Sequence, residues 1–355
     1  MTRPVHGGNL AWAAQLAGCA PSLILDFSAS ISPLGPPQSA IAAIQEGLRL
    51  LKAYPDPCYT QLRLALAQHH QLPPEWILPG NGAAELLTWA GWDLKEQLVT
   101  CLVTPAFGDY WRALRAVKAQ IIPYPLSLED GRLPVWGGVV GERKNWGVLL
   151  NNPHNPTGKL FSQKSILSAV EEFALVVVDE AFMDFVPPNK QQSLIELVTD
   201  YPNLVILRSL TKFYSLPGLR LGYAIAHPER LQRWQSWRDP WAVNILAAEA
   251  GIAAVQDYEF QQQTWNWLPS AREKLYQGLA SLPGIKPYES AANFLLVATD
   301  IPSSQLQLQL LQKEKILIRD CLSFPELGDS YFRVAIRTET DNQRLVASLA
   351  RVLGV

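Results

Sequence analysis

The sequence is poor in charge and contains few cysteines. Charged residues make up only 17% of the 355 residues, and 30 Lys and Arg against 32 Asp and Glu leave a net charge of -2. Such a chain has no strong field to attract nucleic acid or anionic lipid, so we expect neither partner. Its four cysteines form no CxxC pair, which argues against a disulfide framework, and we predict no metal site.

A long apolar run is also missing. No uncharged apolar stretch reaches the roughly 18 residues of a membrane span, and the N-terminal MTRPVHGGNLAWAAQ lacks the apolar core of an export signal. We therefore predict a soluble, cytoplasmic protein. Hydrophobic residues make up 48% of the chain, which indicates a globular fold, and the length suggests about two domains.

Short apolar strands alternate with helical stretches along most of the chain. Candidate strands are QLVTCLVT, QIIPYPL, WGVLLNN, FALVVVDE and LVILRSL, and this alternation favours an α/β fold with a mostly parallel sheet. Residues 240–280 are predicted to be helical, and NFLLVAT, KILIRDC and YFRVAIR to form a smaller sheet. We predict an N-terminal segment (1–45) that packs on the small domain and the active site, a large domain (46–244) and a small C-terminal domain (245–355).

A glycine-rich turn and a lysine lie where helical sequence follows predicted strands. Residues 79–85, PGNGAAE, open onto a helical run, so their backbone N–H groups and the helix dipole suit a phosphate. Lys212 follows the strand LVIL in RSLTK, where burial would make its amine nucleophilic. Taken alone, an ordinary loop and a surface lysine are the commoner explanations of these two features.

Two further polar groups follow apolar strands. Asp179 ends the strand VVVD, and a buried carboxylate needs a partner. Asn155 lies in NNPHNPTG, a proline-stiffened loop after the strand GVLL. Because ligands bind at the carboxyl ends of strands in open α/β sheets, we expect these groups to meet. A phosphate cradle, a strand-end aspartate, an amide and a lysine are together what pyridoxal phosphate requires.

The order of these motifs matches a known family. GNGAAE, NNPHNPTG, DEAF, SLTK and GLRLGY resemble, in that order, the motifs of the fold-type I pyridoxal-phosphate enzymes of the class I/II aminotransferase superfamily. The resemblance runs through nearly the whole chain and implies a fold-type I transferase fold with pyridoxal 5'-phosphate as cofactor. HGGN and DFSASISPLG resemble the L-threonine-O-3-phosphate decarboxylase family, although Ser30 and Ser32 stand where asparagines are expected. YPDP is shared with histidinol-phosphate aminotransferases.

The resemblance implies a role for each site residue. Lys212 is the catalytic lysine that bonds to the cofactor and later handles the proton at the substrate carbon, and Asp179 is the partner of the ring nitrogen. Asn155 is similar to the residue that bonds the ring's phenolic oxygen. Phe107, or secondly Tyr110, is the candidate for stacking on the ring, with core packing as the alternative. The other predicted cofactor contacts, all to the phosphate, are Gly82, Ala83, Ala84, Ser209, Thr211, Arg220 and, reaching from a neighbouring subunit, Tyr59.

Substrate anions require cations, and three arginines are candidates. Arg333 matches the superfamily's carboxylate-binding arginine, and Arg319 matches a phosphate-contacting arginine of the histidinol-phosphate relatives. A two-residue period places Arg337 on the same strand face as Arg333. His6 and Asn9 are predicted to close over the substrate as a flap. Solvated side chains are the alternative for the flap and for the arginines.

The resemblance implies one activity and leaves two alternatives. The favoured activity is decarboxylation of L-threonine O-3-phosphate to (R)-1-aminopropan-2-ol O-2-phosphate in cobalamin biosynthesis, by a homodimer with shared active sites. Phe182 stands where many aminotransferases carry a tyrosine, which disfavours an ordinary transaminase. The alternative enzyme is a histidinol-phosphate aminotransferase that uses 2-oxoglutarate. A non-catalytic ligand-binding or regulatory module is the third hypothesis, and the intact Lys212 and Asp179 speak against it.

Overall fold

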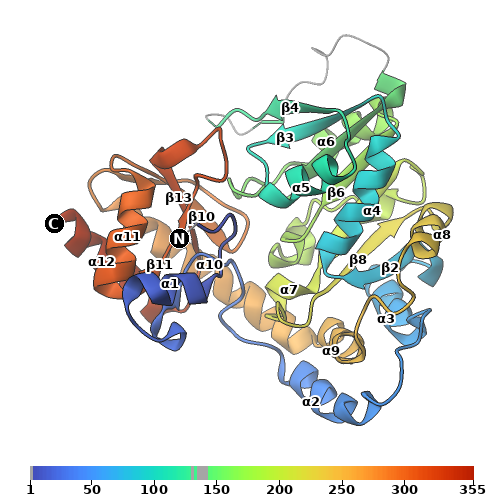
Figure 1. Cartoon of the computed structure of the whole chain (residues 1–355), viewed down its shortest axis with the longest axis horizontal. Coiled ribbons are helices and arrows are strands. Elements are labelled where there is room, and N and C mark those ends of the chain that lie inside the picture. Colours follow the sequence, from blue (N-terminus) through green and yellow to red (C-terminus); the bar gives the residue numbers. More distant parts are fainter. Residues whose placement is uncertain (1–2, 129–131, 134–142) are drawn as a thin grey trace.

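The large sheet organises most of the chain in the computed structural model, which describes residues 3–128, 132–133 and 143–355 (Figure 1). Its seven strands lie in the order β2-β8-β7-β6-β5-β3-β4. Only β8 runs antiparallel to its neighbours among the described strands of this sheet. The strands are β2 (Ile77–Asn81), β3 (Val99–Thr104), β4 (Ile121–Pro125), β5 (Trp146–Asn151), β6 (Leu175–Asp179), β7 (Leu204–Ser209) and β8 (Leu221–Ala226).

Helices cover both faces of this sheet, so its central strands are apolar on both sides. Val177 and Leu207 face one apolar cluster, and Val178 and Ile206 face the other. The first cluster includes side chains of α4 (Ala83–Lys95), α5 (Gly108–Ala116) and α8 (Pro228–Trp237). The second includes side chains of α2 (Gln38–Gly47), α3 (Thr60–His70), α6 (Gln163–Glu172) and α9 (Ile245–Val255), and α2 packs against α9.

The C-terminal part contains a four-stranded antiparallel sheet in the order β12-β13-β10-β9. The N-terminal segment lies on this part, where α1 packs on α11 and β1 pairs in parallel with β11 (Figure 1). The strands of the four-stranded sheet are β9 (Ile285–Pro287), β10 (Phe294–Thr299), β12 (Arg319–Asp320) and β13 (Tyr331–Ala335). The separate parallel pair consists of β1 (Leu25–Asp26) and β11 (Ile316–Leu317). The helices are α1 (Leu10–Ala17), α10 (Tyr258–Ala280), α11 (Ser303–Glu314) and α12 (Glu339–Leu353).

Short helical turns complete the described chain. The four-residue helix α7 (Leu210–Phe213) follows β7 directly and carries Lys212. Single 3-10 turns lie at Pro21–Leu23, Leu48–Leu50, Pro74–Trp76, Arg143–Asn145, Met183–Phe185, Pro188–Lys190, Ile195–Leu197 and Gly328–Ser330. Among the described residues, no helix combines the length and apolarity needed to cross a bilayer.

The predicted α/β fold with a mostly parallel large sheet is confirmed. All eight strands predicted by sequence are present, although KILIRDC divides into β11 and β12. The predicted helical stretch 240–280 is not continuous, because Asn244 and Asp257 each cap the start of a separate helix. Their side chains accept hydrogen bonds from the amides of Ala247 and Phe260, both at 2.9 Å.

Candidate active site

A cavity of about 320 Å³ opens where the carboxyl ends of β5, β6 and β7 approach the start of α4. Side chains of the large sheet, the N-terminal segment and β13 all line it. The structure therefore brings together residues that are hundreds of positions apart in sequence. The predicted site residues in its wall are His6, Ala83, Ala84, Phe107, Tyr110, Asn155, Asp179, Ser209, Thr211, Lys212, Arg220 and Arg333.

Hydrogen-bond donors converge at the start of α4. Gly82 is the residue before the helix, with φ of 73°, and a Cβ atom there would lie 2.6 Å from a guanidinium nitrogen of Arg220. The Ser209 and Thr211 hydroxyls lie 2.7 Å apart in the same wall. Free amides at a helix N-terminus, two hydroxyls and a guanidinium form a donor set suited to a phosphate group.

Lys212 reaches the cavity from α7, immediately after β7. Burial, and after it the positive charges of Arg333 and Arg220, lower the pKa of Lys212 to about 8 against the opposing effect of Asp179. A substantial fraction of the amine is therefore neutral near pH 8. A neutral, desolvated amine is the form that attacks a carbonyl carbon.

Asp179 ends β6, and both of its carboxylate oxygens accept hydrogen bonds. The Tyr110 hydroxyl donates to Oδ2 at 2.7 Å, and the Ala181 amide donates to Oδ1 at 2.9 Å. Burial raises the pKa of Asp179, while these two hydrogen bonds and the charge of Lys212 lower it. The Tyr110 hydroxyl is engaged with Asp179, and its ring packs edge-on against Phe107 with centroids 5.7 Å apart, so stacking of either ring on the cofactor stays a prediction.

Arg333 enters the cavity from β13 and contacts two other segments. It donates to the Asn155 side-chain oxygen at 2.5 Å and to the backbone carbonyl of Ser28 at 3.3 Å. Burial lowers the pKa of Arg333 to about 10, so the guanidinium remains charged at neutral pH. A buried cation in a cavity wall suits a carboxylate ligand.

Asn9, predicted to belong to the flap, and Arg319, predicted to bind substrate, lie in a small cleft that adjoins the cavity. Asn9 caps α1, where its side chain accepts a hydrogen bond from the Trp12 amide. Arg319 donates to the backbone carbonyls of Pro4 and Val5 and to the Ser323 hydroxyl. The structure thus ties Arg319 to the N-terminal segment, and His6, in that segment, lines both the cleft and the main cavity.

Arg337 does not line the cavity, which corrects its predicted position. Strand β13 ends at Ala335, so the two-residue period does not extend to Arg337. Its side chain instead pairs with Asp341 at 3.0 Å and donates to the backbone carbonyl of Asp26 at 3.2 Å. The structure therefore gives Arg337 a role in fixing the start of α12.

Tyr59 also lies outside the cavity of its own chain. Its hydroxyl donates to the Pro240 carbonyl at 3.1 Å and accepts from the Val243 amide at 2.9 Å. Its predicted reach to a neighbouring subunit stays a prediction. Gly82 likewise borders the cavity only through its neighbours Ala83 and Arg220.

Several cavity residues were not predicted from sequence. Ser28, Ser30, Asn151 and Asp109 line the wall, and the buried Ser30 hydroxyl and Asn151 side-chain oxygen have no hydrogen-bond partner among the described residues. Asn151 ends β5 beside Asp179 in the ladder, so its strand-end position was the available signal. The 28–30 segment is brought in by the pairing of β1 with β11, which local sequence does not reveal.

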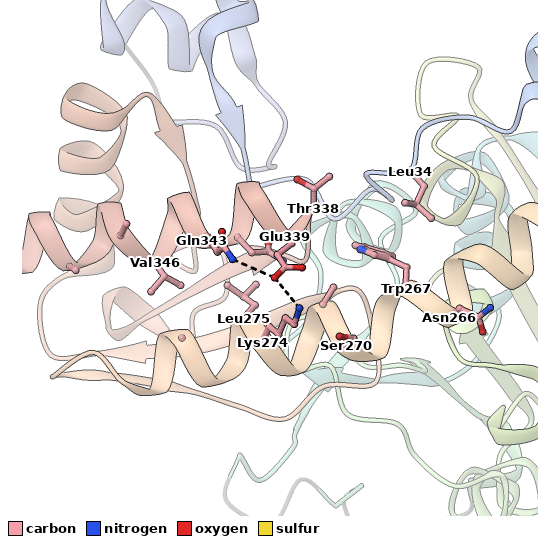
Figure 2. A pocket seen from close by; sticks show the side chains of 15 residues that line it. Leu34, Asn266, Trp267, Ser270, Lys274, Leu275, Thr338, Glu339, Gln343 and Val346 are labelled. Carbon is pink, nitrogen blue, oxygen red and sulfur yellow. Dashed lines mark hydrogen bonds and ion pairs between the residues drawn. The ribbon is translucent and has the colours of Figure 1, made fainter.

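A second groove of about 660 Å³ lies between α10 and α12 (Figure 2). Its floor is formed by small and apolar side chains, including Leu275 and Val346. Lys274 is paired with Glu339 at 2.9 Å, and Glu339 also accepts from Gln343 at 3.4 Å. None of the predicted site residues lines this groove, and its charged groups neutralise one another, so we place the active site in the smaller cavity.

Comparison with known protein families and proteins identifies the class of protein to which this fold and cavity belong. The model of the aminotransferase class I and II family matches residues 23–349, and the chain belongs to this family. The threonine-phosphate decarboxylase of Salmonella typhimurium (strain LT2) is 40% identical, over 98% of this chain and 96% of that protein. The predicted resemblance to the decarboxylases is thereby confirmed.

Aminotransferases are also similar to the chain, at lower identity. The histidinol-phosphate aminotransferase of Symbiobacterium thermophilum is 34% identical, over 91% of this chain and 89% of that protein. The crystal structure of the histidinol-phosphate aminotransferase from Clostridium acetobutylicum superimposes with a TM-score of 0.86 at 28% identity, covering 93% of this chain and 99% of that one.

Proposed function

We propose that the protein is a pyridoxal-phosphate-dependent decarboxylase that converts L-threonine O-3-phosphate to (R)-1-aminopropan-2-ol O-2-phosphate and carbon dioxide, in cobalamin biosynthesis. The observation that carries the proposal is the shared cavity of Lys212, Asp179 and Arg333 beside the donors at the start of α4. Similarity to a threonine-phosphate decarboxylase over nearly the full length selects this reaction within the family.

The cavity residues fit pyridoxal phosphate. The amides of Ala83 and Ala84, the Ser209 and Thr211 hydroxyls and Arg220 would hold the cofactor phosphate, because these donors converge at the helix terminus. The Gly82 amide, also predicted to contribute, donates instead to the Gly80 carbonyl at 2.8 Å. Asp179 would hold the proton on the ring nitrogen. The Asn155 oxygen accepts from Arg333, which leaves its amide nitrogen to donate to the ring's phenolic oxygen. When bound, the cofactor supplies an electron sink for the carbon that loses its carboxylate.

Lys212 and Arg333 would act on the substrate. The neutral Lys212 amine would hold the cofactor through its aldehyde carbon until the substrate amine takes that place, and Lys212 would then take up the proton that the substrate amine gives up. Arg333 binds and orients the substrate carboxylate, whose bond to the α-carbon then breaks to release carbon dioxide. Lys212, now protonated, donates its proton to the α-carbon, so one proton replaces the departing carboxylate.

The substrate phosphate would bind at the mouth of the cavity. His6 lines both the cavity and the adjoining cleft that contains Arg319, and the two side chains interact electrostatically. A phosphate between them would replace some of the backbone contacts that Arg319 makes with Pro4 and Val5. Binding of substrate would thereby be coupled to the position of the N-terminal segment.

The competing enzyme is a histidinol-phosphate aminotransferase. Its support is the 34% identity to the Symbiobacterium thermophilum protein. Identity to the decarboxylase is higher and covers more of the chain. Phe182, which packs edge-on against Phe294 with centroids 5.0 Å apart, supplies no hydroxyl to the cavity, in keeping with the decarboxylase.

A homodimer with shared active sites and a cytoplasmic location form part of the proposal. Tyr54 and Trp241 stack with centroids 4.5 Å apart, and both rings are exposed beside the segment that Tyr59 contacts. An exposed aromatic pair of this kind suits a subunit contact. Mixed dimers of Lys212→Ala and Tyr59→Phe subunits should regain activity, because one of their two sites then contains both native residues.

A product assay tests the proposed activity. Purified protein loaded with pyridoxal phosphate is given L-threonine O-3-phosphate in one vessel and histidinol phosphate with 2-oxoglutarate in another. We expect carbon dioxide from the first and no glutamate from the second. Glutamate without carbon dioxide would establish the aminotransferase instead, and failure to bind the cofactor would remove both enzymes.

A further inference from the structure

Tyr110 makes a hydrogen bond that its predicted stacking role does not explain. The residue lies on α5, is only 2% exposed, and donates its hydroxyl to Asp179 Oδ2 at 2.7 Å. Distances of this size are typical of a hydroxyl that donates to an ionised carboxylate. The ring is held by the apolar cluster of α4 and α5, so the hydroxyl has a fixed position relative to β6.

The second oxygen of Asp179 is fixed from the backbone. The Ala181 amide donates to Oδ1 at 2.9 Å, so the carboxylate is oriented from both ends. The ionisable groups that influence it are Tyr110 and Asp109 from α5 and Lys212 from α7. The charge of Asp109 raises the pKa of Asp179, whereas the hydrogen bond from Tyr110 and the charge of Lys212 lower it.

We propose that Tyr110 is a positioning residue that holds the Asp179 carboxylate ionised and oriented toward the nitrogen of the cofactor ring. This inference rests on the proposed cofactor but goes beyond it. It states that Tyr110, which would not itself bond to the cofactor ring nitrogen, determines the orientation and charge of Asp179, which would. A carboxylate that loses a hydrogen bond from a neutral donor becomes easier to protonate. Without the hydroxyl, Asp179 would become neutral at a higher pH and lose its attraction for a protonated ring nitrogen.

The test compares two ligands on two variants. Tyr110→Phe removes one oxygen and keeps the ring, and Tyr223→Phe is the matched control, since that buried hydroxyl contacts His70 at 2.7 Å. Affinity is measured by quenching of tryptophan fluorescence, from pH 5 to 9, for pyridoxal phosphate and for its analogue in which carbon replaces the ring nitrogen. The analogue retains the phosphate and the aldehyde.

We expect Tyr110→Phe to weaken pyridoxal phosphate binding by about tenfold at neutral pH. The acid limb of its affinity profile should also move to higher pH. Binding of the carbon analogue should be nearly unchanged, and Tyr223→Phe should leave both affinities and both profiles as in the native protein. An equal loss for the two ligands would overturn the inference, because Tyr110 would then contribute packing alone.

Two further results keep this inference separate from the proposed function. If the native protein binds pyridoxal phosphate and Tyr110→Phe binds it equally well, the positioning role is wrong and the decarboxylase proposal stands. If the native protein binds no pyridoxal phosphate, both fail. Loss of near-ultraviolet circular dichroism would show that Tyr110→Phe does not fold. In that case Asp179→Asn supplies a second measurement, because this variant should abolish the preference for pyridoxal phosphate over the carbon analogue.

Discussion

The carboxyl edge of the large sheet carries two polar clusters that are neighbours in sequence but have different surroundings. Asp179, Ser209 and Lys212 line the cavity, whereas Glu180 and Arg208 belong to a second cluster that is completely buried. Successive side chains of a strand point to opposite faces of the sheet, so Ser209 faces the cavity and Arg208 faces the buried cluster. The comparison shows how similar residue types acquire a chemical role on one face and a structural role on the other.

The buried cluster is paired throughout. Glu180 accepts from the Leu194 amide at 2.9 Å and the Ser193 hydroxyl at 2.6 Å, and lies 3.3 Å from Arg208. Arg208 also pairs with Asp184 at 2.7 Å. Burial by itself lowers the pKa of Arg208, but the two carboxylates raise it overall. Arg208 therefore keeps a permanent charge, in contrast to Lys212, whose pKa is lowered to about 8.

Removing the lysine from the cavity should have the largest effect. Lys212→Ala lacks both the nucleophile and the proton donor, so we expect decarboxylation to fall by about four orders of magnitude. The folded protein should be as stable as the native one or more stable, because a buried amine is lost. Carbon dioxide release and urea unfolding are the measurements, with Lys274→Ala, on the second groove, as the control that retains activity. Substantial activity in Lys212→Ala would remove Lys212 from the mechanism.

Breaking the buried cluster should instead act on stability. Arg208→Met leaves Glu180 and Asp184 buried without their cation, so we expect a loss of about 3–5 kcal/mol in the free energy of unfolding. Urea unfolding measures it, and Arg351→Met, which removes an exposed partner of Glu314, should not move the midpoint. An unchanged midpoint for Arg208→Met would show that the cluster does not support the sheet edge.

The pH dependence of the rate of cofactor capture should follow the protonation of Lys212. Because its folded pKa is about 8, the amine is protonated and unreactive below this pH and neutral above it. The rate at which apoprotein captures pyridoxal phosphate should therefore rise about tenfold per pH unit below pH 8 and level off above it. Stopped-flow absorbance from pH 6 to 10 measures the rate. A rise centred above pH 10 would mean that the cavity does not perturb the lysine.

The smallest effect is expected at Phe182. Phe182→Tyr adds a hydroxyl to the cavity wall, and a single added hydrogen bond is worth about 1 kcal/mol, or roughly fivefold in rate. We expect a shifted absorption maximum and a decarboxylation rate within that range, with carbon dioxide still the product. Conversion of the variant into an efficient transaminase would instead make this position the determinant of reaction type.

Sequence predicted the local parts of the site better than the distant ones. Lys212, Asp179 and Asn155 each follow an apolar strand, and the rule that ligands bind at strand ends placed them together. Arg337 was misplaced because β13 ends at Ala335 and because the Arg337 side chain reaches the Asp26 carbonyl, a tertiary contact that local sequence does not reveal. The hydrogen bond from the Tyr110 hydroxyl to Asp179 was not predicted, because the position of α5 relative to β6 follows from helix packing across the sheet.

The central claim is that the cavity removes a carboxylate and that Lys212 returns one proton to the same carbon. Incubation of the cofactor-loaded protein with L-threonine O-3-phosphate in deuterium oxide, followed by NMR of the product, tests it directly. We predict aminopropanol phosphate with one deuterium at the carbon that lost the carboxylate, in one stereochemical configuration. Threonine phosphate that exchanges its α-hydrogen but keeps its carboxylate would contradict the account.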